Sequence, residues 1–510
     1  MKKILALLLA ISLVLGLAAC GKTEQTLIPG TQIALSDENI TVDGKGIGKE
    51  GAVYAAHDII YYEDGHDFTY GEGEKDDAHT KEEAAAHTVV HITKPGTYVI
   101  SGTISAGQIA VDLGESAQDD PNAVVTLVLN GADITCTVAP AIIFYQVYEC
   151  GDAENPVMTV DTTAAGANIL LAEGTQNTVN GAYVARIYKS VTLSEDGTEI
   201  VDSKKLHKYD GAIYSKMSMN IDGTGVLNVN AENEGIDSEM HLTVNGGTLN
   251  IFSGDDGINT NEDNISVTTI NGGTVNICVT GNYAGEGDGI DSNGWLVIND
   301  GTVITAACGQ SQDSGIDSDC GIYLNGGLVI STGNMLDAIQ GEQTYAVFTF
   351  REKQTAGQTY SLKNADGATA VEITPANDFT VLVMSAPELI AGEYTMWQGD
   401  IQLSGMSAGM VGGFDMGGNQ GERPELPEGV TPPEGMKFPE NGQPPEMEQN
   451  FGHSDSKEPP KKPEGEQPRE NQMPQPDEEY PLPGGYNGEM QGKVDQVFSL
   501  KQGSNSFTIV

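Results

Sequence analysis

Short segments of alternating apolar and polar residues recur through the middle of the chain, separated by glycine-rich turns. Residues 241–244 (HLTV) and 248–251 (TLNI) show the pattern, with apolar side chains at every second position. A two-residue period over so few residues predicts a β-strand, because an amphipathic helix needs a longer run with a period of 3.6 residues. Each unit of the pattern consists of a strand, a turn, a strand and a turn. The central chain is therefore predicted to be all-β.

Two motifs repeat within this pattern and indicate stacked coils. The first, Gly-Ile-Asp and its variants, aligns on Ile213, Ile236, Ile258, Ile290, Ile316 and Ile339, in steps of 23, 22, 32, 26 and 23 residues. The second, Asn-Gly-Gly-Thr and its variants, occupies residues 245–248, 271–274, 299–302 and 325–328. One such unit cannot bury its own apolar face, whereas stacked units bury a continuous core. The repeats predict a right-handed single-stranded parallel β-helix, or β-solenoid, with loops of different size on one edge.

The rest of the chain is predicted to form the two ends of this β-helix and one insertion. Of the 22 prolines, 15 lie between Pro424 and Pro483 among Glu, Gly and Gln, a composition typical of disorder. The predicted order is a signal peptide (1–20), N-terminal strands and an acidic loop (21–87), the parallel β-helix (88–341), a C-terminal β-strand cap (342–404), a disordered Pro/Glu/Gly-rich acidic arm (405–493) and a returning strand pair of the cap (494–510). The arm is thus predicted to be an insertion within the cap.

The first residues predict export and a lipid anchor. Lys2 and Lys3 precede an apolar run, which ends in Leu-Ala-Ala-Cys at Cys20. This is the pattern of a secretory signal and is too short for a membrane span. The end of the run resembles a bacterial lipobox, which implies lipid attachment at Cys20. An ordinary signal peptide with a chance cysteine is the alternative. We therefore expect the protein on the extracellular face of the bacterial cell membrane.

Cysteines and histidines give no clear metal or disulfide framework. The other five cysteines lack CxxC spacing, so a Cys136–Cys150 bridge competes with isolated buried thiols, which we favour. Several histidines lie in an acidic insert at residues 52–86, where their irregular spacing favours a solvated loop over a metal site.

The formal net charge of −48, from 73 acidic and 25 basic residues, restricts the partners. Such a charge argues against nucleic acid and against attraction to anionic lipid, so only the lipid at Cys20 would hold the chain to a membrane. Cations are the expected partners instead.

Carboxylates and amides recur beside the aligned isoleucines and predict calcium. Stacking would place like charges on neighbouring rungs, and no Lys or Arg occurs between Met217 and Phe350 to offset them. Calcium accepts several carboxylate and amide oxygens in flexible geometry. The predicted ligands are Glu234, Asp237, Asp255, Asp256, Asn259, Asp288, Asp291, Asp313, Asp317 and Asp337. The alternative is that these residues close turns by hydrogen bonding to backbone.

An ordered set of motifs resembles a known family, the carbohydrate-binding-domain proteins of clostridial and related bacteria. The motifs are residues 96–102 (GTYVISG), 174–179 (GTQNTV) and 210–216 (DGAIYSK), followed by the Gly-Ile-Asp repeats. The resemblance covers about residues 88–402 and the last strand pair. It implies surface lipoproteins with a parallel β-helix similar in shape to pectate lyases, bound calcium, and binding of acidic and plant-wall polysaccharides. Gly211 stands where the family often has Ala, and the Pro-rich arm is not shared.

Within this resemblance, the residues favour a binding protein over an enzyme. A polysaccharide lyase needs a basic side chain and a hydrolase needs a controlled acid pair, whereas residues 217–350 offer no Lys or Arg, and Asp255–Asp256 is one acidic pair among many. A calcium-dependent lyase or hydrolase is the alternative, and a structural or adhesive surface protein is the second. An acidic face would repel an acidic polysaccharide unless calcium bridges the carboxylates of protein and sugar, so such binding is expected to depend on calcium. Neutral sugars would instead stack on aromatic rings, for which the candidates are Trp295, Tyr323 and Tyr283.

Overall fold

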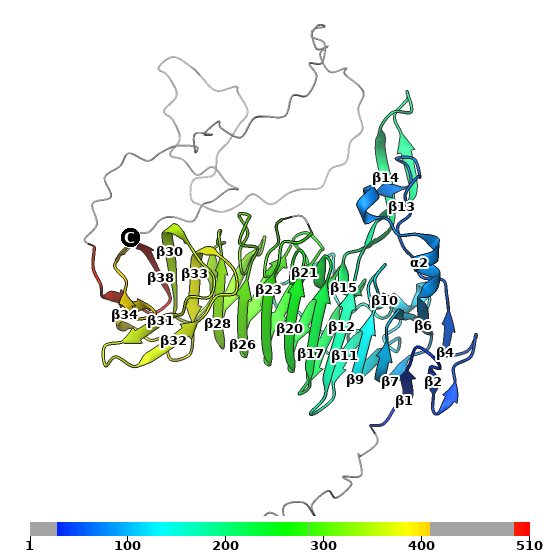
Figure 1. Ribbon diagram of the computed structural model, residues 1–510, viewed down its shortest axis with the longest axis horizontal. Helices are drawn as coiled ribbons and strands as arrows, with labels where there is room; N and C mark the ends of the chain where they lie inside the picture. Colours follow the sequence, from blue (N-terminus) through cyan, green and yellow to red (C-terminus); the bar gives the residue numbers. More distant parts are fainter. Residues whose placement is uncertain (1–27, 284, 408–493) are drawn as a thin grey trace, which may run out of the picture. The chain divides into compact units, whose positions relative to one another are not determined.

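Strands from successive coils lie side by side and pair in parallel, as the repeats predict (Figure 1). The computed structural model describes residues 28–283, 285–407 and 494–510, which all belong to one compact unit formed by residues 1–414 and 492–510. Predictions for the signal peptide and Cys20 lie outside the described residues, as does nearly all of the Pro-rich arm. The described chain is all-β with two short helical segments and one α-helix.

Three parallel ladders make up the coils. The first contains β9 (Val125–Thr135), β11 (Ala167–Leu171), β16 (Met219–Gly223), β19 (Leu242–Val244), β22 (Val267–Ile270), β25 (Trp295–Ile298), β27 (Gly321–Leu324) and β29 (Ile339–Gln340). The second contains β9, β12 (Gln176–Gly181), β17 (Val226–Ala231), β20 (Thr248–Ser253), β23 (Thr274–Val279), β26 (Thr302–Ala306) and β28 (Leu328–Gly333). The third contains β6 (Thr88–Ile92), β8 (Gly107–Asp112), β10 (Ile142–Gln146), β15 (Gly211–Ser215), β18 (Glu234–Ser238), β21 (Ile258–Thr260) and β24 (Ile290–Ser292).

The third ladder contains the repeated isoleucines, stacked in register at its centre. Ile213, Ile236, Ile258 and Ile290 are consecutive partners and are fully buried. Burying each such side chain contributes about 1.5–3 kcal/mol. One copy of the motif was assigned wrongly, because Ile339 pairs with Ile322 in the first ladder rather than extending the third. The last step of 23 residues therefore matches the length of a coil, but it ends on a strand of the first ladder instead of the third.

Side-chain amides tie neighbouring coils together outside the core. Asn228, Asn250 and Asn276 form one ladder, in which the amide nitrogens of Asn250 and Asn276 each donate to the amide oxygen of the preceding asparagine, at 3.0 and 2.9 Å. The asparagines of the Asn-Gly-Gly-Thr motif form a second, exposed ladder at 2.9–3.0 Å, made of Asn245, Asn271, Asn299 and Asn325. The turns of this motif need glycine, since Gly273 has φ of 78° and its Cα lies against backbone of the preceding coil.

Antiparallel strands at the carboxyl end close the stack and make the sheets mixed. The cap strand β33 (Phe379–Ser385) pairs antiparallel with β28 and with β30 (Tyr345–Gln354). A further sheet contains β31 (Tyr360–Asn364), β32 (Thr369–Ile373), β34 (Gly392–Gln398), β35 (Ile401–Gln402) and β37 (Phe498–Leu500). Aromatic side chains of Phe348, Tyr360 and Phe379 lie in a separate apolar core beneath these strands.

The returning segment supplies two strands, which do not pair with each other as a hairpin would. Strand β37 joins β34, whereas β38 (Ser504–Ile509) joins β30 and β36 (Gly405–Ser407). The amide of Asn505 separates the two strands by bonding the carbonyls of Lys501 and Tyr345. Residues 405–407 were assigned to the disordered arm but form β36, because Met406 is buried against the cap.

The amino-terminal segment is more regular than the predicted acidic loop. Strand β1 (Thr31–Leu35) pairs in parallel with β7 (Gly96–Ile104), and β4 (Val53–Ala56) pairs antiparallel with β6; the short strands β2 (Thr41–Val42), β3 (Lys45–Gly46) and β5 (Gly71–Glu72) complete this end. Helix α2 (Lys81–Ala86) follows the 3₁₀ turn η1 (Lys75–Asp77). Thr80 and Glu83 cap α2 reciprocally, a signal that the sequence contains and that was overlooked. A second 3₁₀ turn, η2 (Glu115–Asp119), follows β8.

A long antiparallel hairpin interrupts the coils between β12 and β15. It consists of β13 (Val184–Leu193) and β14 (Ile200–Tyr209), and it projects from the stacked strands in Figure 1. The short strand β5 pairs with its base. The sequence interpretation had continued the β-helix through this region, although the turn at Asp196-Gly197 signals a hairpin. Among the described residues, no helix is long and apolar enough to cross a membrane.

Candidate functional site

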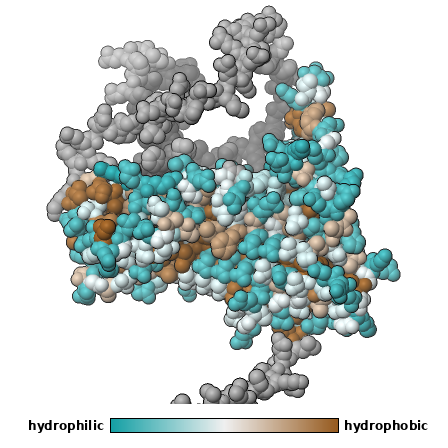
Figure 2. Space-filling view, viewed as in Figure 1, coloured by the Kyte–Doolittle hydropathy of each residue, from teal (hydrophilic) through white to brown (hydrophobic). Residues whose placement is uncertain are grey.

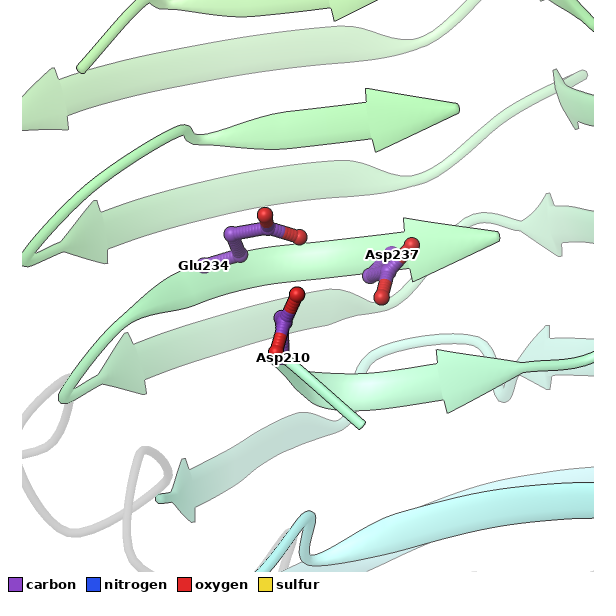
Figure 3. Close-up of side chains that lie close together, drawn as sticks. All are labelled: Asp210, Glu234 and Asp237. Atoms are coloured by element: carbon purple, nitrogen blue, oxygen red, sulfur yellow. The ribbon is translucent and has the colours of Figure 1, made fainter. Parts of the chain in front are cut away.

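Three buried carboxylates converge where β15 and β18 begin. Asp210 immediately precedes β15, and Glu234 and Asp237 lie on β18 of the next coil; one oxygen of each lies within 4.8 Å of the others. Figure 3 shows the three side chains around one small space. All three residues are buried, and Asp237 has no exposed surface. This carboxylate cluster brings together two of the predicted ligands and one residue that the sequence analysis missed.

Asp210 was missed because it is displaced by one position in the register. Glu234 pairs with Gly211, so Asp210 lies one residue before the position that the aligned column would have used. The sequence does contain a signal for Asp210, which is the Asp-Gly pair directly before Ala-Ile-Tyr, the weaker copy of the motif at residues 212–214. Lys208 was missed as well, and its ammonium group lies 2.8 Å from Oδ2 of Asp210. The cation that offsets this cluster therefore comes from the hairpin, outside the stretch that lacks Lys and Arg.

The carboxylate cluster retains oxygen atoms without hydrogen-bond partners. Asn259 donates to Oε1 of Glu234 at 3.1 Å, and Asn261 donates to Oδ1 of Asp237 at 2.7 Å. The second carboxylate oxygens, Oε2 of Glu234 and Oδ2 of Asp237, are buried without a partner among the described residues, as is Oδ1 of Asn259. An unpaired buried polar oxygen costs about 1–3 kcal/mol. The arrangement is unfavourable unless a proton or a cation completes it.

Burial and mutual repulsion hold protons on this cluster. Desolvation raises the pKa of Glu234 well above its usual range, and the neighbouring Asp237 and Asp210 charges raise it further. Desolvation likewise raises the pKa of Asp237, with Glu239 and Asp210 adding to the effect. A single lysine faces three carboxyl groups, so full ionisation leaves two uncompensated charges. Carboxylate and amide oxygens in this number fit a hard divalent cation such as Ca²⁺, and Glu234, Asp237, Asp210 and Asn259 would hold it.

The other predicted ligands form a chain of hydrogen-bonded turns rather than a second convergent cluster. Asp256 accepts the backbone N–H of Asp288 at 2.6 Å, and Asp288 accepts that of Ser314 at 2.5 Å. One oxygen of each carboxylate thus accepts a backbone hydrogen bond from the next coil, instead of closing its own turn as the alternative holds. Burial raises the pKa of Asp256 well above its usual range and that of Asp288 to about 10.

The remaining candidates lie along the same edge. Asp313 accepts N–H of Gly287 at 2.6 Å, and burial raises the pKa of the adjacent Asp255 to about 6. Burial raises the pKa of Asp291 to about 6, and burial together with a hydrogen bond to Asp337 raises that of Asp317 to about 8. Within the described residues, these carboxylates do not form a group of three within 4.8 Å.

An open groove of about 1110 Å³ runs beside the carboxylate cluster. Its floor follows the outer side of β6, β8, β10 and β15, and the hairpin β13–β14 supplies one wall. Three tyrosine rings, of Tyr145, Tyr209 and Tyr214, stand in contact at centroid distances of 5.4 and 4.8 Å. This lysine groove is named for the lysines that line it, which are Lys189, Lys204, Lys205, Lys208 and Lys216. A strongly acidic chain thus gathers five of its lysines in one place.

The charged side chains of the lysine groove differ in whether they already have a hydrogen-bond or ion-pair partner. Lys189, Lys204, Lys205 and Lys216 are exposed, and no described carboxylate forms an ion pair with them. By contrast, Glu149 accepts the backbone N–H and the hydroxyl of Ser218, at 2.7 and 2.6 Å. Glu239 accepts the hydroxyl of Tyr214 at 2.7 Å. Asp58 lies 2.8 Å from Nε2 of His91. Seven carboxylates line the groove in all, and Asp58, Asp112, Glu115, Asp119 and Glu262 among them are exposed beside the lysines.

Of the predicted aromatic residues, Tyr283 lines a hollow. Trp295 and Tyr323 are half-buried on β25 and β27 and line neither the lysine groove nor another described hollow. Tyr283 is 42% exposed and lies beside Tyr183 in a separate hollow. The tyrosines of the lysine groove were not selected from the sequence, because their proximity depends on strands from distant coils.

Described thiols are free, and two histidines of the amino-terminal segment are hydrogen-bonded to backbone. Cys136 and Cys150 are free, and Cys136 is buried. His87 bonds the carbonyl of Glu83 and the backbone N–H of Thr137, and His57 bonds the carbonyl of His87. No group of three possible metal-binding side chains within the described residues includes a histidine.

The fold and the site define a stacked-coil β protein with a buried carboxylate cluster and an open groove lined by lysine and tyrosine. The model of one family, described as "Carbohydrate-binding domain-containing protein", matches residues 86–405, and the chain belongs to this family. A relative of the same description in Acetivibrio thermocellus is 31% identical over 163 residues, which is 32% of this chain and 44% of the relative. The match therefore spans less than half of that relative's length. No solved structure matches the chain.

Proposed function

We propose that the protein binds acidic polysaccharide in the lysine groove and does not cleave it. The observation that carries the proposal is the gathering of exposed lysines without ion-pair partners, beside three adjoining tyrosine rings, in a chain of net charge −48. Family membership and the shared description of the relative support a carbohydrate ligand.

Recognition in the groove would combine charge and stacking. Uronate carboxylates accept charge-assisted hydrogen bonds from ammonium groups, which are about twice as strong as neutral hydrogen bonds. The half-buried ring of Tyr145 offers an apolar face to the C–H face of a sugar, whereas Tyr209, which contacts it, and Tyr214 are 6% and 2% exposed and support that ring. A volume of about 1110 Å³ is large enough for several sugar units in an open groove. Lysine recognition needs no bridging cation, so it revises the expectation that calcium must link the protein to the polysaccharide.

The scaffold of this groove is proposed to be a right-handed, single-stranded parallel β-helix. The three parallel ladders and the stacked isoleucines support this architecture over residues 88–341. Calcium is proposed as the cofactor, held at Asp210, Glu234 and Asp237 and not at all of the predicted ligands. The unpartnered buried oxygens of Glu234 and Asp237 support this assignment. Because Lys208 links the cluster to the hairpin, a cation here would also fix one wall of the groove.

Affinity for polygalacturonate tests the proposed function. Lys204→Ala combined with Lys205→Ala should weaken binding by about tenfold or more, because two charge-assisted contacts are lost. The matched control is Lys45→Ala with Lys49→Ala, which removes the same charge at exposed positions outside the groove. If both double variants bound polygalacturonate equally weakly, the effect would come from net charge alone. That result would overturn the assignment of the groove as the binding site. Failure of the wild-type protein to bind polygalacturonate would overturn the proposed ligand.

Cleavage by a polysaccharide lyase is the second candidate, and one observation favours it. The groove contains lysines and the Asp58–His91 pair, so the absence of Lys and Arg between residues 217 and 350 does not exclude a base. A lyase would release unsaturated uronate products, which absorb in the ultraviolet. We expect no such absorbance from polygalacturonate with calcium present, and its appearance with loss in His91→Ala would establish the lyase.

A structural or adhesive role without glycan binding is the third candidate. It would apply if the coils served only as a spacer, and the pattern of free lysines disfavours it. We place the protein on the outer face of the bacterial cell membrane through Cys20, which lies outside the described residues. Cys20→Ser should release the protein from the membrane fraction. Retention of that variant in the membrane would contradict the lipid anchor.

A further inference from the structure

A second hollow, of about 780 Å³, lies where the base of the hairpin meets β17 and β20. The phenol of Tyr183 donates to Oδ1 of Asp77 at 2.6 Å, which fixes a ring that is 6% exposed. Tyr283 is 42% exposed, and its ring stands at 77° to that of Tyr183 with a centroid distance of 5.0 Å. The two rings therefore form an aromatic corner of the hollow.

Phe252 adds a third ring to this hollow, from β20. It is 50% exposed, and its neighbours on the adjoining strands are Asn230 on one side and Cys278 on the other. Figure 2 shows apolar residues gathered along the middle of this face, over strands β17 to β28. Three aromatic side chains from separate parts of the chain thus line one hollow, and two of them offer exposed surface to a ligand.

Among the described residues that line this hollow, every charged side chain is acidic. The carboxylates belong to Glu74, Asp76, Asp77 and Glu232. Arg186, at the base of the hairpin, is paired with Glu72 and does not line the hollow. Burial raises the pKa of the Tyr283 phenol, and the charge of Asp77 raises it further. The hollow therefore favours a positively charged ligand.

The carboxylates of the hollow are too far apart to share one metal ion. Within the described residues, they form no group of three whose ligand oxygens lie within 4.8 Å of one another. A calcium or magnesium ion needs its oxygens at about 2.0–2.6 Å. A larger organic cation can lie against aromatic rings, while carboxylates offset its charge from a greater distance. A methylated ammonium group has this chemistry, because ring faces attract its charge and it needs no close oxygen ligands.

We propose that the hollow formed by Tyr183, Tyr283 and Phe252 binds a small organic cation that carries a methylated ammonium group. The ammonium would lie within about 6 Å of the ring centroids of Tyr283 and Phe252. This site goes beyond the proposed polysaccharide binding, and none of its lining residues lines the lysine groove. The group occurs in free solutes such as choline and in phosphocholine. The carboxylates would repel a phosphate, so the free cation is the favoured ligand.

Calorimetric titration of the whole protein with choline tests the proposal. Choline should bind, and its uncharged analogue with carbon in place of nitrogen should bind at least about tenfold more weakly, because it has the same shape without the charge. Phosphocholine should also bind more weakly than choline. Absence of choline binding, or equal binding of choline and the uncharged analogue, would overturn the cation site. Tighter binding of phosphocholine than of choline would overturn the assignment to a free cation.

Variants of the two exposed rings provide the second arm of the experiment. Tyr283→Leu and Phe252→Leu keep an apolar side chain but remove the aromatic face, so each should weaken choline binding by about tenfold or more. The matched control is Phe68→Leu, because Phe68 is 51% exposed but lines no described hollow. Unchanged affinity in both ring variants, or an equal loss in the control, would overturn the site. Thermal melting of each variant checks that the fold is retained.

A carboxylate variant tests the contribution of charge. Glu232→Gln should weaken choline binding by about threefold or more at low salt, whereas exposed Glu173→Gln, outside the hollow, should leave it unchanged. Equal effects of the two substitutions would mean that net charge alone attracts choline, which would overturn the site. All of these variants should bind polygalacturonate as the wild type does, so failure of the cation site leaves the proposed function of the lysine groove intact.

Discussion

At the scale of single residues, the central feature is a set of buried carboxyl groups with too few cations. Glu234 and Asp237 each keep a buried oxygen without a described partner, and Lys208 is the basic side chain that reaches the cluster. The sequence identified both acids, because they flank a repeated isoleucine. It could not identify Asp210 or Lys208, since their positions depend on the register between β15 and β18 and on the course of the hairpin.

Neutralising Glu234 should separate the effect of the carboxylate cluster on stability from its proposed binding of calcium. In chelator at neutral pH, Glu234→Gln should raise the free energy of unfolding by about 1–3 kcal/mol, because folding no longer has to protonate a carboxyl group that is ionised in the unfolded chain. The same variant should lose most of the increase in melting temperature that calcium gives the wild type. Exposed Glu173→Gln is the control and should change neither quantity. Destabilisation of Glu234→Gln in chelator, or a full calcium response, would contradict the cation site.

The stacked aspartates predict how stability depends on pH. Burial raises the pKa of Asp291 to about 6, of Asp317 to about 8 and of Asp288 to about 10, from an ordinary value of 3.8. The folded chain then keeps protons that the unfolded chain releases, so the stability these groups contribute is complete below pH 3.8 and is lost as pH rises through the folded values.

We therefore expect the free energy of unfolding in chelator to fall between pH 5 and pH 8, as measured by urea denaturation at a series of pH values. Over this range, aspartates with lowered pKa, such as Asp161, are ionised in both states and do not oppose the trend. A free energy that rises or stays constant from pH 5 to pH 8 would show that these carboxyl groups are solvated or paired.

At the scale of elements, periodicity predicted strand type and stacking but not every pairing. The motif around Ile236, Ile258 and Ile290 forms one ladder, because a one-residue slip would turn the apolar side chains out of the core. The copy at Ile339 follows the same spacing yet joins the first ladder. Helix α2 and the hairpin β13–β14 were overlooked, because they are inserted units whose local signals are weaker than the repeat.

The asparagine ladders give a direct test of how the coils are held together. Asn250 is half-buried and bonds amides on both sides, so Asn250→Ala should lower the free energy of unfolding by about 1–2 kcal/mol. Asn271 makes the equivalent two bonds on the exposed ladder, where water replaces them, so Asn271→Ala should cost less than about 1 kcal/mol. Equal losses in the two variants would mean that burial does not set the strength of these ladders.

At the scale of the whole molecule, the sequence predicted an all-β chain of stacked coils and a family, but not where a ligand would lie. Net charge suggested that an acidic polymer would need a bridging cation, because overall composition hides local groups of lysines. Lys204 and Lys205 lie far along the chain from Tyr145, and the hairpin brings all three to one groove.

A crystal structure of the protein with an oligogalacturonate and calcium tests the account most directly. We predict sugar density in the lysine groove, with uronate carboxylates within hydrogen-bond distance of Lys204 or Lys205 and a sugar ring against Tyr145, and an ion bound by Asp210, Glu234 and Asp237. Oligogalacturonate bound elsewhere on the coils, with the groove occupied only by solvent, would contradict the central claim.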